Sequence, residues 1–259
     1  MADCRSLREK IRSGPLLYGC AIHTLSPSAV EVIGLCGADF VWIELEHAGT
    51  DMMQAEHLCR AAELRGMLSL LRIQDGSRTS VLRALEVGGK VIAVPQIHNA
   101  AQAAAVAEYG KFPPLGQRGF NTASRGLLYG LCADTVPGVF EYANRDTCLL
   151  VQIESEEGLH NAEAIIATPG IDGVLVGPGD LSTSLGIAGQ WDNEDLIRTI
   201  EGIFAIAHRH EKLVATVCPT NAMTARWKAA GAHLLNVSGD LALLRKALTE
   251  RLAEVRTLG

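Results

Sequence analysis

The sequence of 259 residues predicts a (β/α)₈ TIM barrel. Short apolar runs bounded by turn residues alternate with helical patterns, which is typical of parallel strands joined by crossover helices. Eight such strand–helix units can be counted, and the chain has the length of a single barrel, so we interpret residues 1–259 as one domain. A doubly wound sheet would also alternate, but the Gly-x-Gly-x-x-Gly turn expected after its first strand is absent.

The predicted strands are apolar runs of five to seven residues. They cover residues 16–22, 40–46, 68–72, 91–95, 149–153, 173–177, 213–217 and 234–238. Most of these runs lack a polar alternation, as expected of strands that are buried on both faces.

The predicted helices fill the segments between the strands. Residues 6–12 form a short helix expected to close the bottom of the barrel, and residues 135–144 form a helix that leads into the fifth strand. The eight crossover helices cover residues 26–36, 52–65, 77–87, 100–109, 161–167, 193–212, 222–230 and 240–255. Ser26 with Pro27 marks one helix start, and Asp240 is expected to cap the last helix.

Residues 111–134 interrupt this rhythm, because their first part is rich in Pro and Gly. Long irregular segments inside compact α/β domains are usually functional or mobile. Arg118 lies in this segment and is a candidate cation for the site.

Composition limits the possible functions. Hydrophobic content of 48% and charged content of 20% indicate a globular protein. A net charge of -6 without a basic stripe argues against a nucleic-acid partner. No apolar run approaches the roughly 20 residues that a membrane helix needs. Seven scattered cysteines and a charged N-terminus without a secretory signal predict reduced thiols in the cytoplasm.

Two carboxylates stand out at predicted strand ends. Glu154 follows the fifth apolar run, and Asp180 follows the sixth run and its Gly177-Pro178-Gly179 turn. Because the carboxyl ends of barrel strands meet at one mouth, both are expected at neighbouring positions there. Two carboxylates form a hard oxygen site that suits Mg²⁺ or Mn²⁺. An acid at a strand end can also simply cap a helix or meet an arginine.

Further polar residues are expected at the same mouth. Arg72 would add charge to a substrate oxygen, and His47 would act as a base, with Glu86 holding it in one tautomer. Each also has a plain structural interpretation: an ion pair for Arg72, a loop hydrogen bond for His47 and a solvated helix position for Glu86. The remaining polar strand-end positions are Glu44, Glu46 and Gln152, and His23 is expected to be structural.

Four segments in this order resemble the HpcH/HpaI aldolase family, the metal-dependent class II pyruvate aldolases. They are Trp42-Ile-Glu-Leu-Glu-His47, Lys111-Phe-Pro-Pro-x-Gly-x-Arg-Gly119, Leu150-Val-Gln-Ile-Glu154 and Asp172-Gly-Val-x-x-Gly-Pro-x-Asp-Leu-Ser182. The resemblance spans the first to the eighth strand. Some positions depart from it. Glu44 and Glu86 stand where the family usually has Asp, Gly49 stands where Pro is frequent, and Gly88-Gly89-Lys90 stands where Gly-Ala is usual.

The resemblance implies a barrel of the phosphoenolpyruvate/pyruvate type and a set of site residues. Glu154 and Asp180 would bind Mg²⁺, Mn²⁺ or Co²⁺. His47 and Arg72 would be catalytic, with Glu86 as the partner of His47. Gln152, Gly179 and Arg72 would contact pyruvate. It further implies a homohexamer or trimer in which the last helix, residues 240–256, is exchanged between subunits and covers its apolar face.

Several activities fit these residues. The first is a lyase that cleaves and forms 4-hydroxy-2-oxo acids, giving an aldehyde and pyruvate through a metal-bound enolate. The alternative is a decarboxylase of oxaloacetate, or a lyase like macrophomate synthase, that makes the same enolate. A non-catalytic barrel that binds a small acid and an acyl-CoA lyase remain as further alternatives.

Overall fold

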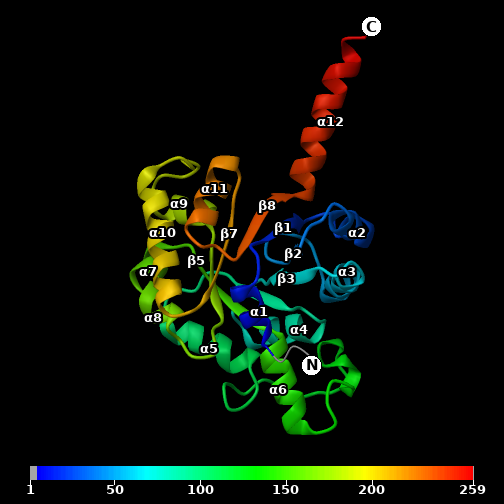
Figure 1. Cartoon of the computed structure of the whole chain (residues 1–259), viewed down its shortest axis with the longest axis vertical. Helices are drawn as coiled ribbons and strands as arrows, with labels where there is room; N and C mark the ends of the chain where they lie inside the picture. The colour runs from blue at the N-terminus through cyan, green and yellow to red at the C-terminus, as the bar shows by residue number, and fades with distance from the viewer. Residues whose placement is uncertain (1–4, 259) are drawn as a thin grey trace.

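The computed structural model describes residues 5–258, and its eight parallel strands close into one barrel in chain order (Figure 1). The predicted (β/α)₈ fold is therefore confirmed. The strands are β1 (Leu17–Ile22), β2 (Phe40–Glu44), β3 (Leu68–Arg72), β4 (Val91–Val94), β5 (Cys148–Ile153), β6 (Gly173–Val176), β7 (Leu213–Val217) and β8 (Leu234–Gly239). Each predicted strand is present, with ends that differ by at most two residues.

Successive residues of each strand belong in turn to two apolar clusters, one on each face of the closed sheet. Ala21, Trp42, Leu70, Leu150 and Leu175 belong to the cluster inside the barrel. The residues between them pack outward against the helices. Because successive strand residues point to opposite faces, the residue two positions after an inner residue also points inward. This alternation selects which side chains line the mouth.

The structure describes twelve α-helices, most of which cover the outside of the barrel. They are α1 (Leu7–Ser13), α2 (Pro27–Leu35), α3 (Met52–Leu64), α4 (Arg78–Glu86), α5 (Ala100–Gly110), α6 (Val136–Asp146), α7 (Glu156–His160), α8 (Ala162–Ile166), α9 (Pro178–Ser184), α10 (Glu194–Arg209), α11 (Asn221–Ala229) and α12 (Asp240–Arg256), with a 3₁₀ segment η1 (Arg125–Gly130). As predicted, α1 closes the bottom, because its Ile11 packs into the cluster inside the barrel.

Three local predictions were wrong. Strand β2 ends at Glu44 and not at residue 46, because the Glu44 side chain accepts the N–H groups of Glu46 and His47 and so turns the chain. The expected turn at Gly177-Pro178-Gly179 is instead the start of helix α9, with Pro178 at its first position. Gly239 and not Asp240 is the N-cap of α12.

Helix α12 projects away from the barrel and buries none of its residues in this chain (Figure 1). Its leucines 241, 243, 244, 248 and 252 are all exposed. A groove of about 1010 Å³ runs where α12 leaves the barrel, beside α2 and β1.

The part of the chain that the structure describes contains no helix long and apolar enough to cross a membrane. Its six described cysteines are free thiols.

Candidate active site

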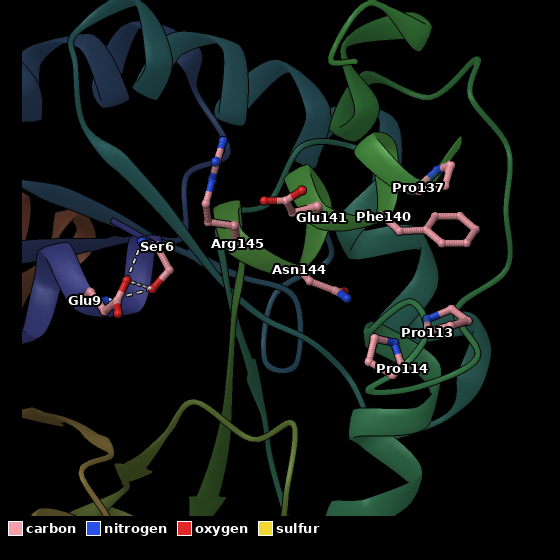
Figure 2. A pocket seen from close by; sticks show the side chains of 9 residues that line it. All are labelled: Ser6, Glu9, Pro113, Pro114, Pro137, Phe140, Glu141, Asn144 and Arg145. Carbon is pink, nitrogen blue, oxygen red and sulfur yellow. Dashed lines mark hydrogen bonds between the residues drawn. The ribbon is translucent and has the colours of Figure 1, made fainter. Parts of the chain in front are cut away.

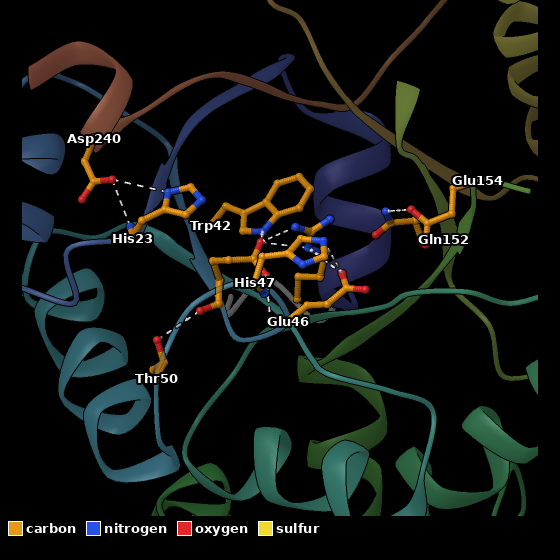
Figure 3. Close-up of polar contacts among 10 residues, drawn as sticks. His23, Trp42, Glu46, His47, Thr50, Gln152, Glu154 and Asp240 are labelled. Atoms are coloured by element: carbon orange, nitrogen blue, oxygen red, sulfur yellow. Dashed lines mark hydrogen bonds and ion pairs between the residues drawn. The ribbon is translucent and has the colours of Figure 1, made fainter. Parts of the chain in front are cut away.

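The polar residues at the mouth are set by the inward alternation of the strands. Two positions after the inner residues Trp42 and Leu70 come Glu44 and Arg72, and these two are paired in the register of β2 with β3. Two positions after Leu150 comes Gln152, and Glu154 follows after two more. The alternation brings polar groups from separate strands to one rim (Figure 3).

Glu44 is the centre of a hydrogen-bonded group on the β2–β3 side of the rim. Its Oε2 accepts from Arg72 Nε at 2.8 Å and from Trp42 Nε1 at 3.1 Å, and Arg72 Nη2 lies 2.6 Å away. Burial by itself would raise the pKa of Glu44, but the hydrogen bond and charge of Arg72 outweigh it and lower the pKa. Glu44 is therefore a carboxylate that fixes Arg72 over the Trp42 ring, 5.2 Å from its centroid.

Glu46 and His47 lie above this group, just beyond the strand. Glu46 Oε2 is 3.2 Å from Arg72 Nε and 3.7 Å from His47 Nε2. Burial raises the pKa of Glu46, although the charges of Arg72 and His47 oppose the shift. The His47 side chain is 58% exposed, so its ring can reach a ligand in the mouth.

Glu154 and Gln152 form the β5 side of the rim. Gln152 Nε2 donates to Glu154 Oε2, and Glu154 Oε1 accepts the backbone N–H of Gln96 at 2.9 Å. Gln96 adopts a left-handed conformation with φ of 55° at this point. Burial raises the pKa of Glu154 to about 7; the Gln96 N–H opposes this shift and the charges of Asp180 and Glu46 add to it.

Asp180 is brought to the same side by the first turn of α9, which has no side-chain cap. Its charge acts on both Glu46 and Glu154. Between the strand end and this turn lies Gly177, where an added Cβ would sit 2.7 Å from Gln152 Nε2 and 2.8 Å from Glu154 Oε2. The absence of a side chain at Gly177 therefore lets Gln152 and Glu154 lie close to the backbone there. Gly179 lies next to Asp180 in the same turn.

The predicted pairing of Glu86 with His47 is not made within this chain. Glu86 is the last residue of α4, and crossover helices run antiparallel to the strands, so it lies at the end of the barrel away from the mouth. Burial raises the pKa of Glu86, and the charge that opposes this shift comes from Arg118.

Arg118 is likewise absent from the mouth group. It is 5% exposed and stacks over Phe112, with its guanidinium carbon 5.0 Å from the ring centroid. Burial lowers its pKa to about 10, and the charge of Glu86 opposes the shift.

The residues around the rim fit a divalent cation. Two acidic side chains whose charges repel each other share one side of the mouth, and the buried Gln152 Oε1 beside them has no hydrogen-bond partner among residues 5–258. Within the same residues, no three His, Cys, Asp or Glu side chains form a complete cage. Mg²⁺ sites of enzymes commonly use one or two carboxylates and leave the other positions to water and substrate.

Sequence reasoning missed Gly177 and the backbone of Gln96 as parts of this site. Gly177 ends a predicted strand and Gln96 directly follows one, so the strand ends themselves were the signal. A separate hollow of about 520 Å³ lies between α1, the Pro113-Pro114 segment and α6, away from the carboxyl ends of the strands (Figure 2). The mouth therefore differs from this hollow in its clustered, inward-facing charges.

Comparison with known proteins agrees with this geometry. The family model for HpcH/HpaI aldolase/citrate lyase matches residues 18–247, which include every strand-end residue described above. The chain belongs to the HpcH/HpaI aldolase/citrate lyase family. It is accordingly an enzyme of the class II aldolase type, a carbon–carbon lyase.

Relatives of this HpcH/HpaI family chain include curated enzymes and solved structures. It is 35% identical over 236 residues to a 5-keto-4-deoxy-D-glucarate aldolase of Klebsiella pneumoniae, covering 91% of this chain and 90% of the relative. An HpcH/HpaI family protein from Burkholderia cenocepacia superposes with a TM-score of 0.88 at 30% identity, over 96% of this chain and 98% of the other. The citrate synthase SbnG superposes with a TM-score of 0.88 at 25% identity, over 98% of each chain.

Proposed function

We propose that this chain cleaves and forms 4-hydroxy-2-oxo acids, with pyruvate and an aldehyde as the two fragments. The supporting observation is the group of Glu154, Gln152 and Asp180 beside Gly177, where the missing side chain lets Glu154 and Gln152 lie close to the backbone. The similarity to 5-keto-4-deoxy-D-glucarate aldolase supports a hydroxylated oxo acid as substrate.

The proposed cofactor is a divalent ion, Mg²⁺, Mn²⁺ or Co²⁺, held by Glu154 and Asp180. When bound, it would act as a Lewis acid on the keto oxygen and stabilise the negative charge that develops there. The hydrogen bond from Gln96 N–H to Glu154 Oε1 holds this carboxylate in one orientation, and it would bind the ion from there.

Arg72 would bind the keto oxygen and add positive charge as the enolate forms. Its contacts with Glu44 and Glu46 use Nε and Nη2, which leaves Nη1 for a further acceptor. Gln152 and the backbone of Gly179 would orient the carboxylate end of pyruvate.

His47 would move the proton of the 4-hydroxyl group during cleavage and return one during addition. Glu46, 3.7 Å from His47 Nε2, is the carboxylate in this chain that would orient it.

We also propose, from the family resemblance and the exposed apolar face of α12, a homo-oligomer that is a trimer or hexamer. A cytoplasmic location is proposed from the free thiols.

A metal-dependence assay tests the proposed reaction. We expect pyruvate release from a 4-hydroxy-2-oxo acid to stop in EDTA and to return with Mg²⁺, Mn²⁺ or Co²⁺. Glu154→Ala should abolish it, whereas Glu156→Ala, two residues further in an exposed position on α7, should retain it. Activity that persists in EDTA would overturn the proposal.

A second candidate is decarboxylation of oxaloacetate, because it needs the same enolate and the same residues. Measuring oxaloacetate loss beside aldol cleavage separates the two. A kcat/KM for oxaloacetate well above that for every hydroxy oxo acid would favour the decarboxylase.

A further inference from the structure

The β8–β1 side of the mouth carries two polar side chains that the proposed reaction does not yet use. His23 lies two positions after the inner residue Ala21, and Asn236 lies two positions after the inner residue Leu234. Both therefore point into the barrel. In the described part of the chain, Asn236 Oδ1 is buried without a hydrogen-bond partner, and the buried His23 Nδ1 faces Asp240 Oδ1 at 3.4 Å without a hydrogen bond of good geometry.

His23 is held in place by Asp240, which lies at the start of α12. Asp240 Oδ1 accepts the backbone N–H of His23 at 3.0 Å and lies 3.4 Å from its Nδ1. Asp240 Oδ2 accepts from the backbone N–H of Thr24 at 2.9 Å and from its hydroxyl at 2.6 Å. Partial burial would raise the pKa of Asp240, but these hydrogen bonds outweigh it and lower the pKa. Asp240 is thus a fixed carboxylate.

The fixed carboxylate decides which way the imidazole faces. A carboxylate beside Nδ1 favours the tautomer with the proton on Nδ1, which leaves Nε2 as an acceptor. In Figure 3 the Nδ1 side of His23 faces Asp240 and the other ring nitrogen points toward the side on which Trp42 lies. The ring rests on the backbone of β8, because a Cβ at Gly239 would lie 3.5 Å from it.

His23 stands across the mouth from the predicted cation ligands. The eight strands close in chain order, so β1 lies opposite β5 in the ring. Figure 3 shows Gln152 and Glu154 on one side of the mouth, His23 and Asp240 on the other, and His47 between them. The interior of an eight-stranded barrel is only wide enough for side chains or one small ligand. A substrate with its oxo-acid end at Glu154 therefore extends its other end toward β1.

We propose that His23, oriented by Asp240, and Asn236 form the subsite for the hydroxyl groups on the aldehyde portion of the substrate. A hydroxyl group donates to an acceptor such as the imidazole Nε2 or the carboxamide Oδ1 of Asn236, so two hydroxyls, one on each acceptor, satisfy both side chains. An aldehyde without hydroxyls leaves these groups unpaired, and such a site discriminates against it. The inference rests on the proposed aldolase activity and adds the chemical class of its second substrate.

The test compares two aldehydes that differ in their hydroxyl groups, D-glyceraldehyde and propanal, each added to pyruvate. In His23→Ala and in Asn236→Val, we expect kcat/KM for D-glyceraldehyde to fall by about 10- to 100-fold, since a buried partner is lost. The kcat/KM for propanal should change by less than about threefold, because propanal has no hydroxyl group to bond to either side chain. His23→Gln, which keeps a hydrogen-bonding group, should recover part of the loss. His57→Ala, an exposed histidine on α3, is the matched control.

Two further measurements separate this inference from the proposed function. Deuterium exchange into the methyl group of pyruvate needs no aldehyde and should persist in His23→Ala. If wild-type protein shows no metal-dependent exchange, the proposed function fails. The subsite can then still be tested by NMR of protein labelled with ¹³C at the histidine Cε1 atoms. The resonance of His23 is identified because it is missing from the spectrum of His23→Gln.

We expect that resonance to shift on addition of D-glyceraldehyde and to move less with propanal. Equal losses of kcat/KM with both aldehydes, no loss with either, or an unchanged resonance would overturn the subsite.

Discussion

At the scale of single residues, the candidate site depends on Gly177. Its φ of -94° and ψ of 93° suit any residue, so the glycine is required by space and not by backbone conformation. We expect Gly177→Ala to lower kcat/KM by more than about tenfold, because the new methyl group displaces Gln152 and Glu154. Steady-state kinetics at saturating Mg²⁺ or Mn²⁺ would measure this.

The matched control for this substitution is Gly202→Ala on α10, where an added Cβ meets nothing within 4 Å. That variant should retain full activity and be more stable by about 0.5–1 kcal/mol, since alanine favours a helix interior. Equal activity in both variants would show that the space beside Glu154 is not needed.

His233, which precedes β8, links stability to pH. Its Nδ1 accepts the backbone N–H of Val214 at 3.1 Å, which requires a neutral ring. Burial lowers its pKa to about 4, and the charges of His208 and Arg12 add to the effect. The unfolded chain, with a histidine pKa near 6.5, therefore binds more protons below that pH. Stability contributed by the neutral ring is complete above pH ~6.5 and is lost as pH falls toward ~4.

We expect this loss to be about 1–2 kcal/mol, since the ring is only partly buried. Urea unfolding at several pH values between 7 and 4.5 would measure it. In His233→Gln, whose amide oxygen can accept the same N–H, the free energy of unfolding should fall less over this range. An identical pH dependence in the two proteins would contradict the assignment.

At the scale of elements, the sequence predicts strands better than the partners of their side chains. The strand positions follow from apolar runs, and Glu154 was found because it ends such a run. Helix α9 was missed because Gly177-Pro178-Gly179 also has turn composition, although Pro at a first helical position was an available signal. The Glu86–His47 pairing is not made within this chain, because α4 runs antiparallel to its strand, and sequence spacing alone does not show that direction.

His23 was expected to be structural for a related reason. Its partner Asp240 is 217 residues away in sequence and is brought close only by closure of β8 onto β1. Alternation from Ala21 was enough to place His23 inside the barrel. It was not enough to place a carboxylate beside its ring.

A buried ion pair joins the segment after α5 to the start of β6. Lys111, which is 1% exposed, has its Nζ 2.7 Å from Asp172 Oδ2, and the same oxygen accepts the N–H of Leu149. Asp172→Asn would leave the Lys111 ammonium buried without a countercharge. We expect a loss of about 3 kcal/mol in the free energy of unfolding, measured in urea.

Asp195→Asn, which breaks the exposed pair with Arg198, is the control and should cost less than about 1 kcal/mol. Because Asp172 precedes β6 at the end of the barrel away from the mouth, kcat/KM of folded Asp172→Asn protein should stay near the wild-type value. Comparable stability losses in the two variants would show that the buried ion pair contributes no more to stability than the exposed one.

At the scale of the whole molecule, the C-terminal helix is the element that leaves a whole apolar face uncovered. Helix α12 keeps 17 residues in helical form with none of them buried, although an isolated helix of this length is marginal in water. Leu244 and Leu248 are 59% and 53% exposed, one turn apart on the same face. Large exposed apolar patches mark interaction surfaces. The proposed exchange of this helix between subunits would cover the patch in every copy.

We therefore expect the protein to be a trimer or hexamer, and Leu244→Asp with Leu248→Asp to convert it to smaller species. Burying two new carboxylates in an apolar interface costs several kcal/mol. A loss of this size in the free energy of association is enough to separate most subunits. Light scattering after size exclusion gives the mass directly. Ala253→Asp is the control, because it adds one carboxylate on roughly the opposite face of α12 and should leave the mass unchanged. A wild-type mass of one chain, or an unchanged mass in the double variant, would show that this helix does not hold the assembly together.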